Sequence, residues 1–168
     1  MKQVLITGGA TGIGAATAQV FLERGYRVFV TVHQTAAELP GVTAIPCDIT
    51  DPADVERLFA AVGTVDVLVN NAGIWLSGYV TEISPQDWDL VMNVNLKAIF
   101  HLSQLFVNHC LQHDQMGSIL NITSQAAFHG STTGHAHYAA SKAGLVAFAI
   151  SLARLPQECR FSLDFSGS

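Results

Sequence analysis

Two residues four positions apart, Tyr138 and Lys142, carry side chains that together can move a proton. A free tyrosine titrates near ~10, which is too high for a ready base at neutral pH, and a nearby cation lowers that value. Residues at i and i+4 share one helix face, with Cβ atoms roughly 5–6 Å apart. Such a phenol is suited to protonate a carbonyl oxygen as hydride reaches the carbonyl carbon. A tyrosine and a lysine at this spacing, taken alone, are more often a packed ring beside a solvated amine. Other residues must therefore decide between a catalytic and a structural interpretation.

A glycine-rich segment, Thr7-Gly8-Gly9-Ala10-Thr11-Gly12-Ile13-Gly14, lies near the N-terminus between a strand-like and a helical stretch. Glycines permit a tight turn and let backbone N–H groups approach a pyrophosphate, while a helix N-terminus adds partial positive charge. The spacing G-x-x-x-G-x-G differs from the general G-x-G-x-x-G fingerprint. Plain turn chemistry is the alternative, but after the first strand of an α/β fold the segment favours nucleotide binding.

Short β-branched runs alternate with longer stretches in which apolar residues have helical spacing. The predicted strands are Gln3–Thr7, Arg27–Val32, Val42–Pro46, Val65–Asn70 and Ser118–Thr123. The predicted helices are Gly12–Arg24, Pro52–Ala61 and a long one from Pro85 to about His113. Asp51-Pro52 and Ser84-Pro85 each indicate an N-cap followed by proline in the first turn. Apolar strands joined by helices predict a doubly wound parallel α/β sheet of about six strands, with ligands bound beyond the carboxyl ends of the strands.

The composition suits a single domain over residues 1–168. Apolar residues make up 49% of the chain and charged residues 12%, which argues against disorder. A net charge of −5 offers no basic surface for nucleic acid. No apolar run reaches the roughly 18 residues of a membrane span. The N-terminus has no room for a signal peptide, and three cysteines without metal spacing favour reduced thiols in the cytoplasm.

Three motifs in order resemble the short-chain dehydrogenase/reductase family. They are T-G-x-x-x-G-x-G at the N-terminus, Asn70-Asn71-Ala72-Gly73 closing the fourth strand, and Tyr138-x-x-x-Lys142. The segments WDLVMNVNLKAIF, with Trp88 and Asn95, and GSILNITS, ending in Ser124, strengthen the resemblance. It implies an NAD(P)(H)-dependent oxidoreductase of the Rossmann type acting on a small carbonyl or alcohol, commonly as a homodimer or homotetramer. Within the family the sequence is similar to 3-oxoacyl-carrier-protein reductases and their relatives.

The resemblance also implies roles for individual residues. Tyr138 would be the acid and base, and Lys142 would tune it and hold the nicotinamide ribose. Ser124 would hydrogen-bond the substrate oxygen, and Asn95 would hold a water that relays protons. Each has a plainer alternative: Asn95 could satisfy a helix backbone, and Ser124 could be an ordinary turn serine. Asn71 could brace the fourth strand instead of touching ligand, a role that the family also gives it.

The end of the second strand bears on the choice of nicotinamide, because an acid there disfavours a 2′-phosphate. Val32 occupies that place, and Glu38 is the next carboxylate. By resemblance, His33 and Thr11 stand where NADP-preferring relatives carry basic residues, and the absent acid favours NADP(H) over NAD(H). Asp48 would bond the adenine amino group, or else cap the following helix. The expected cofactor-binding residues are Gly8, Thr11, Gly12, Ile13, Gly14, His33, Asp48, Asn71, Ala72, Gly73, Tyr138 and Lys142.

Three histidines, His129, His135 and His137, crowd the segment between Ser124 and Tyr138. A zinc site would need a fourth ligand with recognisable spacing, and the chemistry needs no metal, so none is expected. Solvated loop histidines are the default interpretation, and a contact with substrate is the alternative.

The C-terminal segment alternates apolar and polar residues, with Cys159, Phe161, Leu163 and Phe165 on one side, and predicts a half-buried sixth strand. The family typically continues for about another third of this length, so the chain is expected to be C-terminally short. Two alternatives to an oxidoreductase therefore stay open. One is a nucleotide-binding or assembly module with little or no turnover. The other is a sugar-nucleotide epimerase or dehydratase, disfavoured because Thr11 stands where its T-G-x-x-G-x-x-G pattern needs glycine.

Overall fold

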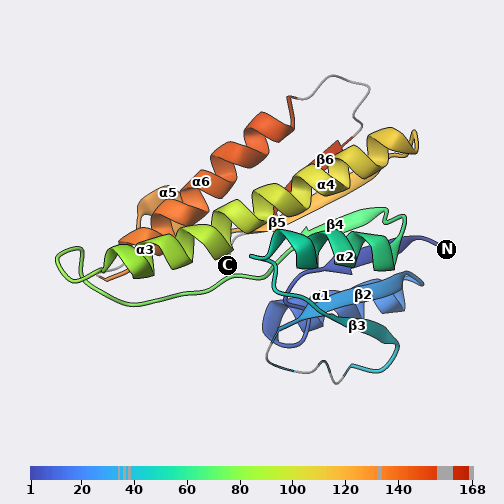
Figure 1. Cartoon of the computed structure of the whole chain (residues 1–168), viewed down its shortest axis with the longest axis horizontal. Helices are drawn as coiled ribbons and strands as arrows, with labels where there is room; N and C mark the ends of the chain where they lie inside the picture. Colours follow the sequence, from blue (N-terminus) through green and yellow to red (C-terminus); the bar gives the residue numbers. More distant parts are fainter. Residues whose placement is uncertain (34, 36, 38, 132–133, 155–160, 167–168) are drawn as a thin grey trace.

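A six-stranded parallel sheet forms the centre of the molecule, with strand order β3-β2-β1-β4-β5-β6 (Figure 1). The structure is a computed structural model that describes residues 1–33, 35, 37, 39–131, 134–154 and 161–166. The strands are β1 (Gln3–Ile6), β2 (Arg27–Val32), β3 (Val42–Pro46), β4 (Val67–Asn70), β5 (Gly117–Ile122) and β6 (Phe161–Ser166). The order reverses direction beside β1, where β4 pairs with its other edge, so the switch point lies between β1 and β4.

Helices lie between successive strands as the alternating pattern predicts, apart from the connection between β2 and β3, where neither the pattern nor the described residues include a helix. They are α1 (Gly12–Glu23), α2 (Pro52–Val62), α3 (Pro85–Met92), the π-helical turn η1 (Asn93–Lys97), α4 (Ala98–Gln112), α5 (Ala126–His129) and α6 (Ala136–Leu152). Most observed boundaries lie within one or two residues of the predicted ones. The predicted doubly wound parallel sheet is confirmed.

Two helices begin at the capping residues that the sequence indicates. The Asp51 carboxylate accepts a hydrogen bond from the Ala53 amide at 2.9 Å, and Pro52 follows in the first turn of α2. The Ser84 hydroxyl accepts from the Asp87 amide at 3.0 Å before α3. Each cap satisfies a backbone donor that has no partner within the helix, so the start of both helices is fixed locally.

The core lies on both faces of the sheet, as the layers in Figure 1 indicate. On one face, side chains of α2 and α4, such as Leu58 and Phe106, pack against Leu5 and Leu68 of the central strands. On the other face, Ala18 of α1 packs with the alternate residues of β1, β2 and β4. Burial of apolar surface on both faces is what a parallel sheet requires, and it explains the near-continuous apolar strands.

The long helix expected from Pro85 to about His113 is interrupted in its middle by the π-helical turn. Apolar spacing alone predicted one uniform helix. A π turn is set by the contacts of its side chains, which a single-sequence pattern does not contain. The continuous segment Pro85–Gln112 spans 28 residues and contains an 18-residue stretch with a mean hydropathy of 1.3, which by length and composition would suit a membrane span. This is weak evidence, since core helices of soluble proteins pass the same test and Leu102 and Phe106 here are buried in the core.

The predicted sixth strand is confirmed as β6, which pairs in parallel with β5 from Phe161 opposite Gly117 to Ser166 opposite Ile122. Cys159 and Glu38 lie outside the described residues. The two described cysteines, Cys47 and Cys110, are buried free thiols.

Burial is the main reason that the pKa of each of these thiols rises to about 11, with nearby carboxylates adding to it. Both therefore stay protonated and unreactive at neutral pH.

Gly117, the first residue of β5, offers a test of how tightly the core is packed. A Cβ there would lie 2.7 Å from Cζ of Phe106 and 2.8 Å from Sγ of Cys110. We expect Gly117→Ala to lower the free energy of unfolding by about 1–3 kcal/mol, measured by urea titration. Adding Cys110→Ala removes one of the crowding atoms, so the double variant should lose less than the sum of the single losses. Strictly additive losses would contradict this account.

Candidate active site

The glycine-rich loop between β1 and α1 has a backbone that only glycine adopts readily. Gly8 and Gly12 have φ of +64° and +54°, in the left-handed region. A Cβ on Gly14 would lie 2.6 Å from Nδ2 of Asn71 and closer still to the carbonyl oxygen of Gly8. The loop therefore folds back against the start of α1 and against the segment that follows β4. Gly12, Ile13 and Gly14 form the first turn of that helix, directly after Thr11.

The side chain of Asn71, which follows β4, braces this loop. Its side-chain amide donates to the carbonyl oxygens of Thr7 and Gly8 at 2.9 and 3.0 Å. In the reverse direction, the Thr7 hydroxyl accepts from the backbone amides of Asn71 and Ala72 at 3.1 and 3.0 Å. These hydrogen bonds join the segments that follow β1 and β4. Thr7 opens the glycine motif, but its side chain was not among the expected site residues.

A cavity of about 600 Å³ opens at the carboxyl ends of the strands. Seven of the expected cofactor residues line it: Gly8, Thr11, His33, Asp48, Asn71, Ala72 and Gly73. The strands that contribute them flank the switch point, where this class of sheet binds dinucleotides. The left-handed glycines and the start of α1 directly after them fit a dinucleotide, because a helix N-terminus offers backbone N–H groups and partial positive charge to a pyrophosphate.

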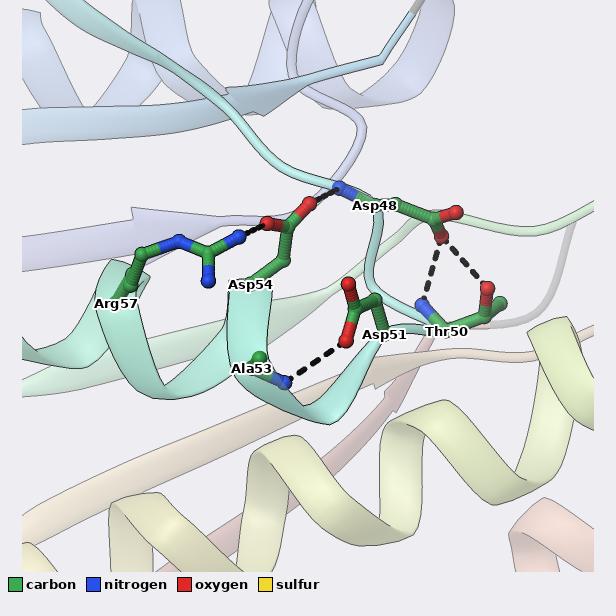
Figure 2. Close-up of polar contacts among 6 residues, drawn as sticks. All are labelled: Asp48, Thr50, Asp51, Ala53, Asp54 and Arg57. Carbon is green, nitrogen blue, oxygen red and sulfur yellow. Dashed lines mark hydrogen bonds and ion pairs between the residues drawn. The ribbon is translucent and has the colours of Figure 1, made fainter.

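Asp48 lines this cavity just after β3. Figure 2 shows its carboxylate accepting two hydrogen bonds from Thr50, from the amide at 2.9 Å and from the hydroxyl at 2.7 Å. These bonds, the hydroxyl one first, hold the pKa of Asp48 below its usual value. Both bonds use Oδ1, and Asp51 caps α2 instead, so Asp48 is not the cap.

The backbone amide of Asp48 is itself fixed from α2. It donates to Oδ2 of Asp54 at 3.0 Å, and the other oxygen of Asp54 pairs with Arg57, as Figure 2 shows. The wall of the cavity at Asp48 is therefore held by side chains of the following helix.

The end of β2 contains no carboxylate at the place where one would contact an adenosine ribose. Val32 is the last residue of the strand, and His33 follows it as an exposed side chain on the cavity wall. Thr11 is exposed across the same cavity and makes no side-chain cap to α1.

Asn95 lies fully buried in the π-helical turn. Its carbonyl oxygen accepts from the Ile74 amide at 2.8 Å, and its amide donates to the Ile74 carbonyl at 2.9 Å. The same amide lies 3.2 Å from the Ser141 hydroxyl, which donates to the Tyr138 carbonyl at 2.7 Å. Asn95 thus satisfies the backbone of the loop after β4, and not that of a helix as its plainer alternative held. Ser141 was not among the expected site residues.

Lys142 is buried, with a relative exposure of 4%, although it carries an ammonium group. Its Nζ donates to the carbonyl oxygen of Ile122 at 2.9 Å and lies 5.8 Å from the centre of the Tyr138 ring. Burial lowers the pKa of Lys142 to about 8. A Cβ on Gly73 would lie 3.6 Å from this Nζ and 3.2 Å from Oδ1 of Asn95. The structure therefore brings Tyr138, Lys142, Asn95 and Gly73 together.

Ser124 is half-buried just beyond the carboxyl end of β5. Its hydroxyl accepts from the Ala126 amide at 3.2 Å, the contact of a turn serine. That bond leaves the hydroxyl proton free to be donated elsewhere.

The expectation of solvated histidines is correct for His129 and wrong for His137. His129 is exposed, whereas His137 has a relative exposure of 1% on the inner side of α6. The sequence places it in a polar segment, but helix α6 begins at Ala136 and turns this side chain inward. His135 is half-buried, and its Nδ1 accepts from the Trp75 indole at 2.7 Å. No three potential metal ligands come together in the part of the chain that the structure describes.

The family model for short chain dehydrogenases matches residues 2–159. The chain belongs to this family. Among curated relatives, the chain is 37% identical to 3-oxoacyl-[acyl-carrier-protein] reductase FabG of Thermotoga maritima, covering 86% of this chain and 64% of the relative. It is 36% identical to 3-oxoacyl-[acyl-carrier-protein] reductase MabA of Mycobacterium bovis, covering 91% of this chain and 62% of the relative. The chain thus spans slightly less than two thirds of the length of these relatives.

Solved structures agree with the family assignment. A short chain dehydrogenase from Mycobacterium smegmatis superposes with a TM-score of 0.90 at 30% identity, over 99% of this chain and 75% of the other. One from Bacillus anthracis gives 0.84 at 28% identity, over 90% of this chain and 68% of the other. The predicted family and its doubly wound fold are confirmed.

The burial of Lys142 should make the stability of the fold depend on pH. Its pKa is about 8 in the folded chain against 10.5 when solvated, so between these pH values the unfolded chain binds more protons. The free energy of unfolding of the parent should therefore rise with pH in this window, relative to Lys142→Met, by up to about 3 kcal/mol. Urea titrations at several pH values measure it. Lys97→Met, at an exposed lysine, is the control, and its free energy of unfolding should change with pH as that of the parent does. The same pH dependence in Lys142→Met and the parent would contradict the lowered pKa of Lys142.

Proposed function

We propose that this protein is an NADP(H)-preferring oxidoreductase that interconverts a small carbonyl compound and its alcohol. The observation that carries the proposal is the burial of Lys142 beside the Tyr138 ring and next to Gly73, which lines the cavity that fits a dinucleotide. A buried ammonium is costly, and a structural lysine would reach solvent. Its position next to a phenol and to Gly73 favours a chemical role over a packing one.

Each side chain has a distinct task in this proposal. A bound nicotinamide supplies hydride exchange with the substrate carbon. The Tyr138 phenol donates its proton to the carbonyl oxygen in reduction and accepts one in oxidation. The ammonium of Lys142 stabilises the phenolate and holds the ribose, and the Ser124 hydroxyl donates to the substrate oxygen.

Proton supply to this pair involves Asn95. Its buried carboxamide holds Ile74 and Ser141, and so fixes the space beside Lys142 in which a relay water would sit. Asn95 is thus proposed to shape the relay through its backbone contacts.

The partners are proposed from the same reasoning. The substrate is a small molecule, and assembly into a homodimer or homotetramer in the cytoplasm follows the family resemblance. The two curated relatives reported above are named for the reduction of 3-oxoacyl groups on acyl-carrier protein, which makes 3-oxo esters a reasonable first panel of substrates.

Tyr138→Phe tests the central assignment. We expect turnover to fall by about 10²–10⁴-fold, because the proton donor is lost, while cofactor affinity stays near that of the parent. Initial rates with NADPH and a panel of carbonyl compounds measure the first, and a fluorescence titration of NADPH the second. Tyr26→Phe is the matched control, since Tyr26 packs against Phe21 far from Lys142. Parent-like rates for Tyr138→Phe would refute the proposal, and binding without turnover in the parent would favour a nucleotide-binding module.

The cofactor preference is tested at the end of β2. We expect His33→Arg to raise the preference for NADPH over NADH by about tenfold, since a permanent cation would meet the 2′-phosphate. Val32→Asp should reverse the preference, because a carboxylate accepts from the ribose and repels that phosphate. Dissociation constants for both cofactors measure the ratio. Tighter binding of NADH than of NADPH by the parent would overturn the assigned preference.

A further inference from the structure

Trp75 lies beside the proposed acid and base, and none of the roles above uses it. It follows Ile74, whose two backbone groups are held by Asn95. The centre of its ring lies 6.4 Å from that of Tyr138, and the ring planes are tilted by 43°. The residue is 67% exposed. The exposed indole is thus tilted beside the ring of Tyr138, whose phenol would bind a carbonyl oxygen.

The indole is held in this place by His135, which directly precedes α6. Its Nε1 donates to Nδ1 of His135 at 2.7 Å, and the two rings meet edge to face with centres 4.8 Å apart. Close by, the Gly78 amide donates to the Gly134 carbonyl at 2.8 Å, so the loop after β4 and the segment before α6 are joined twice. An exposed tryptophan without such contacts would populate several rotamers.

Only one of the two neutral tautomers of His135 can accept the hydrogen bond from the indole. The carbonyl oxygen of Leu76 lies 3.1 Å from the same Nδ1 that accepts from Trp75. A proton on Nδ1 would be donated to Leu76 and would turn the indole N–H away. A proton on Nε2 leaves Nδ1 free to accept from Trp75. The second tautomer is the one that orients the ring.

We propose that Trp75 selects the substrate, by stacking on a flat, uncharged ring attached to the carbonyl carbon. The indole N–H is already satisfied by His135, so the part of the ring left to solvent offers only apolar and π surface. Aromatic rings pair at centre distances of 4.5–7 Å, in offset or tilted arrangements. A ring on the substrate would cover this surface while its carbonyl reaches Tyr138. The inference rests on the proposed function, and His135 is a positioning residue within it.

A binding experiment without turnover tests the proposal. The chain contains two tryptophans, Trp75 and Trp88, so 5-fluorotryptophan labelling gives two ¹⁹F resonances, and Trp88→Phe assigns them. Acetophenone, which carries a flat ring, and 2-butanone, which does not, are titrated in the presence of NADP⁺. A ketone and an oxidised cofactor cannot exchange hydride, so the dissociation constants stay readable even if the assignment of Tyr138 fails.

We expect acetophenone to shift the Trp75 resonance and to bind more tightly than 2-butanone. In an unlabelled series followed by calorimetry, Trp75→Ala and His135→Leu should each reduce this preference by about tenfold. His135→Asn keeps an acceptor near the position of Nδ1 and should retain the preference. Trp88→Phe, at the second tryptophan, should also retain it. Trp75→Leu tests whether aromaticity, and not bulk alone, is needed.

Three results would overturn the proposal. The first is an unchanged preference for acetophenone in Trp75→Ala, shown to be folded by circular dichroism. The second is an equal loss in His135→Asn and His135→Leu, which would reduce His135 to a packing role. The third is a Trp75 resonance that stays in place when acetophenone saturates the parent.

Discussion

The side chain of Asn95 binds both backbone groups of Ile74 and so determines where the chain runs after β4. The carboxamide is fully buried, and a buried amide that loses its partners costs on the order of 1–3 kcal/mol. Through Ser141, the same amide is linked to the backbone of Tyr138. The loop after β4, the π-helical turn and α6 are therefore placed relative to one another by one side chain, and the proposed chemistry depends on that placement.

The short segment after β4 serves two parts of the site at once. Asn71 and Ala72 bond to Thr7 and shape the glycine loop, which fits a dinucleotide. The next residue, Gly73, lies against Lys142 and Asn95 and has no side chain that would separate them from the cavity. A cofactor bound along the strand ends would meet both regions without a break. This continuity accounts for the close spacing of polar and small residues in a segment that has no regular secondary structure.

The sequence is informative where structure is determined locally or by composition. β-Branched runs located the strands, and Asp51 and Ser84 marked two helix starts because a cap acts within one turn. Spacing placed Tyr138 and Lys142 on one helix face. Features that depend on distant contacts could not be predicted in this way. The burial of His137, the bond from Lys142 to Ile122 and the partner of Trp75 sixty residues away all arise from how α6 packs, which periodicity does not encode.

The π-helical turn also has a consequence for the length of the chain around it. An α-helix rotates by about 100° per residue, and a π turn accommodates one residue more than an α turn. The continuous helical segment from α3 to α4 can therefore use two different sides. Along α3 it contacts α6, and along α4 it contacts α2, β4 and β5. Deleting a residue there would restore a regular helix but put these two sides out of phase. The number of residues between the Ser84 cap and the buried face of α4 is thus as constrained as the identity of the residues in the site.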